Sequence, residues 1–125
     1  MLRNRSLLAM ALAMTLALPA SVRAEGDATK GRQIAIDHCS RRHVIPDVNP
    51  YGGIGSTPSF RLLAKRGDYL ERFQSFYARP PHPVFVQVPD VPPPTDNPAS
   101  IATFEITPQQ VEDIIAYAEN VRAAE

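Results

Sequence analysis

Prolines and glycines interrupt this chain in two long stretches and limit where regular secondary structure can form. Residues 45–59 contain three prolines and three glycines, and residues 89–98 contain five prolines. Because proline fixes φ and has no N–H to donate, neither stretch can form a helix interior or a central strand. We therefore expect a mainly α domain whose helices lie outside these stretches, with residues 89–98 forming an extended, polyproline-like surface loop.

The clearest helix is predicted at the end of the chain, from Thr107 onwards. Thr107 is a typical N-cap, Pro108 suits the first turn, and Gln110 completes a capping box. The apolar residues of this segment recur at helical spacing and form one stripe: Val111, Ile114, Ile115, Ala118 and Val121.

Shorter elements are predicted earlier in the chain. One helix covers residues 28–38, where Gly31, Ala35 and Cys39 recur every four residues and so share one face. Because Gly31 and Ala35 are small, another helix can approach that face closely. Two more short helices and a short strand are predicted further along: residues 60–64, residues 69–77, and the alternating Val84, Val86 and Val88.

The first 24 residues have the features of a secretory signal peptide. Arg3 and Arg5 form a positive n-region, residues 6–20 are nearly all apolar, and small residues precede the predicted cleavage site. The apolar run is too short for a membrane span. We expect cleavage after Ala24, which leaves residues 25–125 as one exported domain without a membrane span.

The composition of residues 25–125 excludes some kinds of partner. This domain has ten basic and 13 acidic residues, because three of the 13 basic residues lie in the signal peptide. A net negative charge argues against nucleic acid as a partner. Cys39 is the only cysteine, so no intramolecular disulfide can form, and nothing in the sequence indicates anything other than a monomer. A small domain without tryptophan has a thin core, which a covalently bound cofactor would enlarge.

Residues 39–43, with the sequence CSRRH, carry the strongest chemical signal. They have the length and both ends of the C-x-x-C-H motif, in which cysteine sulfur bonds to a haem vinyl group and the adjacent histidine ligates the iron. Here Arg42 replaces the second cysteine, so Cys39 and His43 are left as the candidate attachment point and ligand. Spacing alone favours the simpler interpretation of Cys39 as a small, buried hydrophobic residue.

Over the whole of residues 25–125 the sequence resembles the small class I c-type cytochromes of bacteria. The similar segments are, in order, the helix leading into the motif (31–39), the loop after it (55–60), the approach to the distal ligand (82–83) and the closing helix (106–117). The resemblance implies a cytochrome c-like fold of three to four helices around a haem pocket, in the periplasm. First and last helices would cross near Gly31 and Tyr117.

The same resemblance implies roles for individual residues. Cys39 would form a thioether and His43 would be the proximal iron ligand, with the Pro58 carbonyl accepting the proton on its other ring nitrogen. Such a bond fixes the tautomer and raises the basicity of the ligand. The domain would hold one haem c by a single thioether and serve electron transfer, with a periplasmic redox protein as partner, or haem-ligand chemistry. It would be an electron carrier or accessory protein rather than an enzyme.

Two positions depart from the family pattern. Arg42 stands at the second thioether cysteine and could contact a haem propionate or point into water. Phe85 stands where the family usually has methionine, and all three methionines lie in the signal peptide, so histidine–methionine ligation is excluded. The proline-rich residues 89–98 look like an insertion beside the missing ligand.

Several alternatives follow for the distal side and for the function. The iron could be five-coordinate and open to NO, CO or peroxide, His82 could complete a bis-histidine site of lower potential, or Phe85 could pack over an open face. The domain could instead be a haem-free accessory or binding subunit of a periplasmic redox enzyme, or Cys39 could be a reactive thiol with a pKa lowered by His38 and the arginines. Haem binding predicts that His43 points into an apolar cleft, lined by Ile45, Ile54, Phe60, Phe73 and Phe85.

Overall fold

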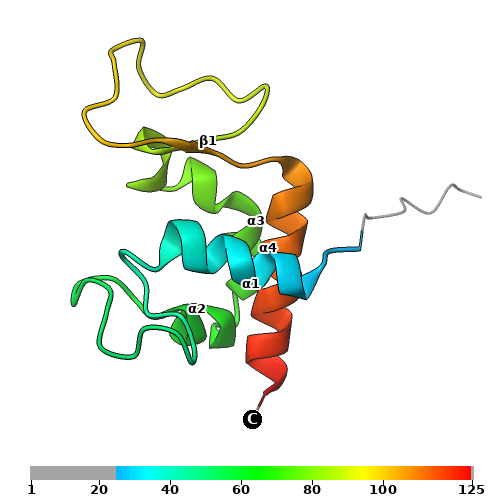
Figure 1. Ribbon diagram of the computed structural model, residues 1–125. Coiled ribbons are helices and arrows are strands. Elements are labelled where there is room, and N and C mark those ends of the chain that lie inside the picture. Colours follow the sequence, from blue (N-terminus) through cyan, green and yellow to red (C-terminus); the bar gives the residue numbers. More distant parts are fainter. Residues whose placement is uncertain (1–24, 125) are drawn as a thin grey trace, which may run out of the picture.

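The structure, a computed structural model, describes residues 25–124 and is mainly helical, as predicted (Figure 1). In chain order the helices are α1 (Ala28–Ile34), α2 (Phe60–Lys65), α3 (Tyr69–Ser75) and α4 (Pro108–Ala123). A π-helical turn (Ala35–Cys39) continues α1, and 3-10 turns cover Phe76–Ala78 and His82–Val84. The predicted signal peptide lies outside the described residues. Within residues 25–124, no helix is both long and apolar enough to cross a membrane.

Helix α4 begins where the sequence predicts it. The Thr107 hydroxyl accepts a hydrogen bond from the backbone N–H of Gln110 at 3.2 Å, and Gln110 Oε1 accepts one from the backbone N–H of Thr107 at 2.8 Å. This reciprocal pair is the predicted capping box. The predicted apolar stripe is buried, together with Asp113 and Tyr117.

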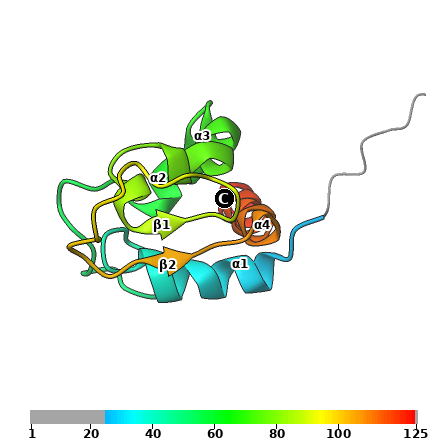
Figure 2. The same cartoon turned by 90° about the horizontal axis from the view of Figure 1, so that it is seen from above.

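Helices α1 and α4 cross at very short range (Figures 1 and 2). A Cβ atom on Gly31 would overlap the backbone carbonyl of Asp113, so only glycine permits this approach. The buried carboxylate of Asp113 accepts a hydrogen bond from the backbone N–H of Asp27 at 2.8 Å, which holds the start of α1 on α4. Ala35, one helical turn further along, is fully buried in the core. The close approach predicted from the small residues of the first helix is confirmed.

Helices α2 and α3 pack on α4 as well. The ring of Phe60 on α2 lies 5.0 Å from that of Tyr117 on α4, measured between centroids. Near the end of α4, Arg122 Nη1 donates hydrogen bonds to the carbonyls of Ala64 at 2.9 Å and Arg66 at 3.0 Å. These two bonds tie α4 to the last turn of α2, whose carbonyls lack helical partners.

Two short strands, β1 (Val86–Gln87) and β2 (Phe104–Glu105), form a parallel pair. The strand is shorter than the valine alternation predicts, because Val84 belongs to the preceding 3-10 turn. Residues 89–103, between the strands, are exposed and contain no helix or strand, as predicted for their proline-rich part. This loop projects beyond the helices (Figure 1).

The first helix differs from its prediction in its second half. The α-helical pattern ends at Ile34, and Ala35–Cys39 forms a wider π-helical turn. A π-helical turn takes up an additional residue, and such turns are frequent at functional sites. It delivers Cys39 to the edge of the core, where the side chain is half-buried.

Candidate functional site

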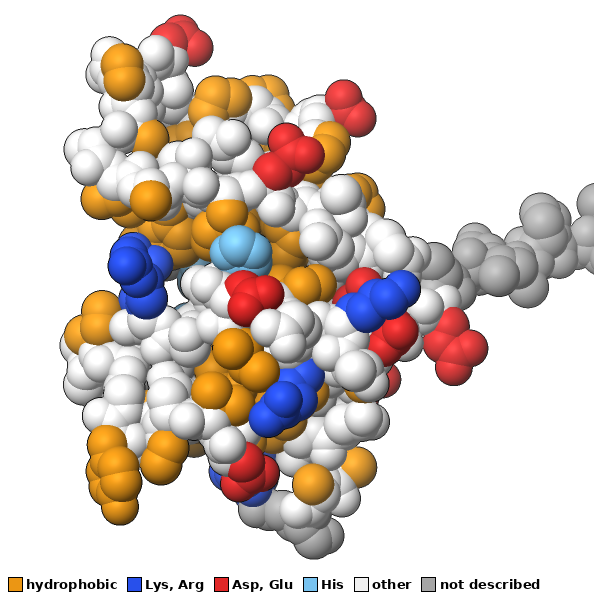
Figure 3. Space-filling model, viewed as in Figure 1, with side chains coloured by type: hydrophobic (Ala, Val, Ile, Leu, Met, Phe, Trp, Pro, Cys, Tyr) orange, Lys and Arg blue, Asp and Glu red, His pale blue; other side chains and the backbone are white. Residues whose placement is uncertain are grey.

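An open cavity of about 320 Å³ lies between the turn that follows Cys39, helices α2 and α3, and the paired strands. Small-ligand sites occupy roughly 300–1,000 Å³, so the volume lies at the lower end of that range. Five phenylalanines line the cavity, together with aliphatic residues and prolines: Phe60, Phe73, Phe76, Phe85, Phe104, Leu63, Val86, Ile114, Pro58, Pro80 and Pro81. Figure 3 shows hydrophobic side chains gathered around a histidine on one face of the molecule.

The structure brings the residues singled out from the sequence to this one cavity: Cys39, Arg42, His43, Pro58 and Phe85. Of the expected apolar lining, Phe60, Phe73 and Phe85 are present. Ile45 and Ile54 are not, and that part of the prediction is wrong. Ile45 is fully buried in the core, whereas Ile54 is 49% exposed. Both lie in a loop without periodicity, where the sequence does not define which way a side chain points.

The turn that carries the CSRRH motif is held in place by the side chain of Asn49. Asn49 Oδ1 accepts a hydrogen bond from the backbone N–H of Ile45 at 2.6 Å. Its Nδ2 donates to the carbonyls of Ser40 at 2.8 Å and His43 at 3.2 Å. The backbone N–H of His43 also donates to the carbonyl of Cys39 at 2.9 Å. These bonds fix the backbone on both sides of His43.

His43 is half-buried in the wall, and its Nδ1 donates a hydrogen bond to the carbonyl of Pro58 at 2.7 Å. Because a carbonyl can only accept, Nδ1 carries the proton and Nε2 carries the free lone pair. Burial lowers the pKa of His43, the bond to Pro58 opposes that effect, and the charge of Arg42 adds to the lowering. The ring is therefore neutral at neutral pH, the form in which histidine binds a metal.

His82 has a matching arrangement on the other side of the cavity. Its Nδ1 donates to the carbonyl of Arg79 at 3.0 Å. Burial lowers the pKa of His82, the bond to Arg79 opposes that effect, and the charges of His43 and Arg42 lower it further. The His43 and His82 rings are parallel within 1°, and their centroids are 6.2 Å apart. The two histidines therefore face the same space with parallel rings.

Arg42 and Phe85 form one contact in the cavity wall. The guanidinium carbon of Arg42 lies 4.1 Å from the centroid of the Phe85 ring, which is a cation–π geometry. Phe85 is 4% exposed and lies 5.6 Å from His82 between ring centroids. Arg42 is therefore directed onto an aromatic ring rather than into open water.

Cys39 lines the cavity as a free thiol. Burial raises the pKa of the Cys39 thiol to about 12. The thiolate is the reactive form of cysteine, so this thiol is protonated at neutral pH and poorly reactive as a free catalytic group. The expected lowering of its pKa by His38 and the arginines is wrong in direction, because desolvation dominates.

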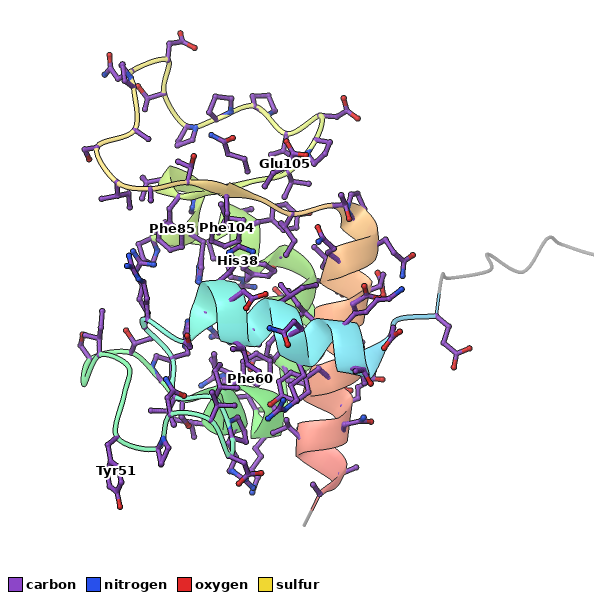
Figure 4. All side chains as sticks on the ribbon, in the orientation of Figure 1. His38, Tyr51, Phe60, Phe85, Phe104 and Glu105 are labelled. Atoms are coloured by element: carbon purple, nitrogen blue, oxygen red, sulfur yellow. The ribbon has the colours of Figure 1, made fainter. Side chains whose placement is uncertain are left out.

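The sequence did not reveal the wall formed by His38 and Phe104. Their rings stack with centroids 4.2 Å apart, and Phe104 lies 6.4 Å from Phe85 (Figure 4). His38 is exposed, as predicted, but it covers the edge of the cavity rather than standing alone in solvent. The proline-rich loop separates Phe104 from Phe85 in sequence, so only the strand pairing brings them together.

Comparison with protein-family models finds no match for this chain, and searches of curated proteins and of solved structures find none either. Among residues 25–124, no three His, Cys, Asp or Glu side chains cluster in a way that could hold a metal ion. The chemistry of the cavity is therefore inferred from its own residues: one thiol, three histidines, three arginines and an aromatic wall.

Proposed function

We propose that this protein is a mono-haem, cytochrome c-like protein of the periplasm that serves electron transfer or haem-ligand chemistry. Haem is attached through Cys39, and His43 ligates its iron. One observation carries the proposal: Cys39 and His43, the latter oriented by its hydrogen bond to the Pro58 carbonyl, line the same largely apolar cavity. The close crossing of α1 and α4 beside this cavity supports a class I cytochrome c fold.

The residues of the cavity suit such a group in several ways. The iron of a bound haem supplies one-electron chemistry. His43 presents the Nε2 lone pair, and its bond to Pro58 keeps the ring in one orientation. Cys39 would hold the group by a thioether, formed when its thiol adds across a vinyl double bond with the hydrogen going to the vinyl carbon, an addition without net oxidation or reduction. Phe60 and Phe73 give the site an apolar wall, and the apolar surroundings of a haem influence its redox potential.

A haem-free accessory role is the second candidate, and one observation favours it. Arg42 replaces the second attachment cysteine and packs on Phe85, so the wall is stable without a second thioether. Against it, the described side chains leave the cavity open and direct His43 into its wall.

The test is the mass and absorption spectrum of the protein exported by a host with cytochrome c maturation. We expect the mass of one haem to persist after acid–acetone extraction, together with a Soret band. Cys39→Ala should lose the acid-stable haem, while Arg42→Cys restores the full motif and should raise the haem yield. If Arg42→Cys carries haem and the wild type made in parallel carries none, the haem-free role is correct.

A further inference from the structure

Two histidines that line the cavity, His43 and His82, have ring centroids at a distance that ligation of one shared metal ion permits. Metal–imidazole bonds are about 2.0–2.1 Å long in zinc proteins, so nitrogens on opposite sides of one metal ion are about 4 Å apart. Each ring centre lies roughly 1 Å behind its nitrogen, so the centroids of two such rings should be about 6 Å apart. The His43 and His82 centroids are 6.2 Å apart, and their planes are parallel within 1°.

Both rings are also held in the tautomer that leaves Nε2 free. Each Nδ1 donates to a backbone carbonyl, His43 to Pro58 at 2.7 Å and His82 to Arg79 at 3.0 Å. Metal-ligating histidines almost always have such a bond on the nitrogen that faces away from the metal. Within residues 25–124, no hydrogen bond of either Nε2 competes with a metal.

Aromatic neighbours fix the position of His82. The ring of Phe76 meets it edge-on at 5.4 Å between centroids, and Phe85 lies against it at 5.6 Å. Phe85 has no ligating atom, and Arg42 covers its ring. His82 thus presents a fixed imidazole beside His43 in the cavity, whereas Phe85 presents no ligating group.

We propose that His82 is the second axial ligand, so that His43 and His82 bind the same haem iron from opposite faces. This inference rests on the proposed haem binding, and it selects the bis-histidine site over an iron with an open distal position. With both axial positions filled from the chain, the iron is six-coordinate and low-spin and has no site for CO or NO. The protein then transfers electrons rather than binding small ligands, at a lower potential than a histidine–methionine haem.

The haem-loaded protein tests this by spectroscopy. We expect a low-spin absorption spectrum in both redox states and no CO adduct on the time scale of mixing. Parallel imidazole planes should also give a rhombic low-spin EPR signal. His82→Gly should convert the ferric protein to high spin and allow CO to bind the ferrous form, and added imidazole should restore the low-spin spectrum. The control is Asn97→Gly, in the exposed loop between the strands and outside the cavity lining, which should leave the wild-type spectrum unchanged.

The outcomes separate the two proposals. A wild-type holoprotein that is high-spin, or that binds CO as fast as His82→Gly, overturns axial ligation by His82 while haem binding stands. A wild-type protein without haem overturns haem binding itself. If His82→Gly yields no holoprotein, His82→Met decides: a low-spin spectrum with a potential raised above the wild type supports the proposal, and an unchanged spectrum and potential contradict it.

Discussion

The two ends of the first helical segment have opposite surroundings. At Gly31 the backbone of α1 touches that of α4, and even a methyl group does not fit. At Cys39 the same segment borders an open cavity of about 320 Å³. Direct backbone contact determines how closely α1 and α4 cross, whereas the shape of the cavity depends on side chains held by individual hydrogen bonds. Substitutions at the crossing should therefore affect folding, and substitutions at the cavity should affect what it can bind.

The largest effect is expected at the crossing. Gly31→Ala would force the helices apart and should lower the free energy of unfolding by about 3 kcal/mol, the upper end of the range for overpacked cores. Urea unfolding followed by circular dichroism measures this. A Cβ at Gly67 meets no atom within 4 Å, so Gly67→Ala is the matched control and should change stability by less than about 0.5 kcal/mol. Equal effects of the two variants would show that backbone contact does not limit the crossing.

The next largest effect is expected at the turn beside the cavity, and it tests whether hydrogen bonds hold this turn as firmly as backbone contact holds the crossing at Gly31. Asn49→Ala removes the acceptor for the N–H of Ile45 and the donor for two carbonyls, so it should cost about 2 kcal/mol. The exchange rate of the Ile45 amide hydrogen should rise, because the free energy of the opening that exposes it should fall by at least the same amount. Asn120→Ala, at an exposed position of α4, is the control. Unchanged exchange at Ile45 in Asn49→Ala would mean that the motif turn is held by something else.

A smaller effect is expected where α4 meets α2, away from both regions. Arg122→Met keeps the aliphatic stem but removes two hydrogen bonds to carbonyls and a guanidinium 4.6 Å from the Tyr69 ring. We expect a loss of about 1 kcal/mol in urea unfolding, because the site is partly exposed. The exposed Arg41→Met serves as the control. A loss as large as that of Gly31→Ala would show that the contact between α4 and α2 is as important for stability as the crossing of α1 and α4.

The smallest effect concerns pH. Hydrogen bonds from Arg66 and Arg72 hold the pKa of Asp68 well below its usual range. The unfolded pKa is about 3.9, so the contribution is fully present above pH 4 and is lost as pH falls below it. Asp68→Asn should slightly flatten the fall in stability between about pH 4 and pH 2. Urea unfolding at several pH values measures the slope, with Asp96→Asn, in the exposed loop, as the control. Identical slopes would show that this exposed ion pair is screened.

Features coded by neighbouring residues could be predicted from the sequence. Helix α4 and its capping box depend on Thr107, Pro108 and Gln110 alone, and the close crossing follows from the absence of a Cβ at Gly31. The directions of Ile45 and Ile54 could not be predicted, because loop side chains follow tertiary hydrogen bonds such as those of Asn49. Propensity and spacing favour a continuous α-helix over residues 28–38, so the π-helical turn was not foreseen.

The candidate site was foreseen in its residues but not in its geometry. The motif pointed to Cys39 and His43, and the structure lines one cavity with both. The position of His82 depends on the 3-10 turn at His82–Val84 and on a bond to the Arg79 carbonyl, which no short-range pattern encodes. Phe104 reaches the wall only through the parallel pairing of β2 with β1. Contacts between distant segments are the part that sequence patterns do not define.

The π-helical turn at Ala35–Cys39 makes the position of the Cys39 side chain sensitive to the length of the chain. A helix turns by about 100° for each residue, so removing one residue from this turn would rotate Cys39 relative to Gly31 by about a quarter of a turn. Gly31 is fixed against α4, so the rotation would carry the thiol away from the cavity wall. The number of residues in this turn therefore sets the angular phase between the packing face of the segment and the Cys39 sulfur.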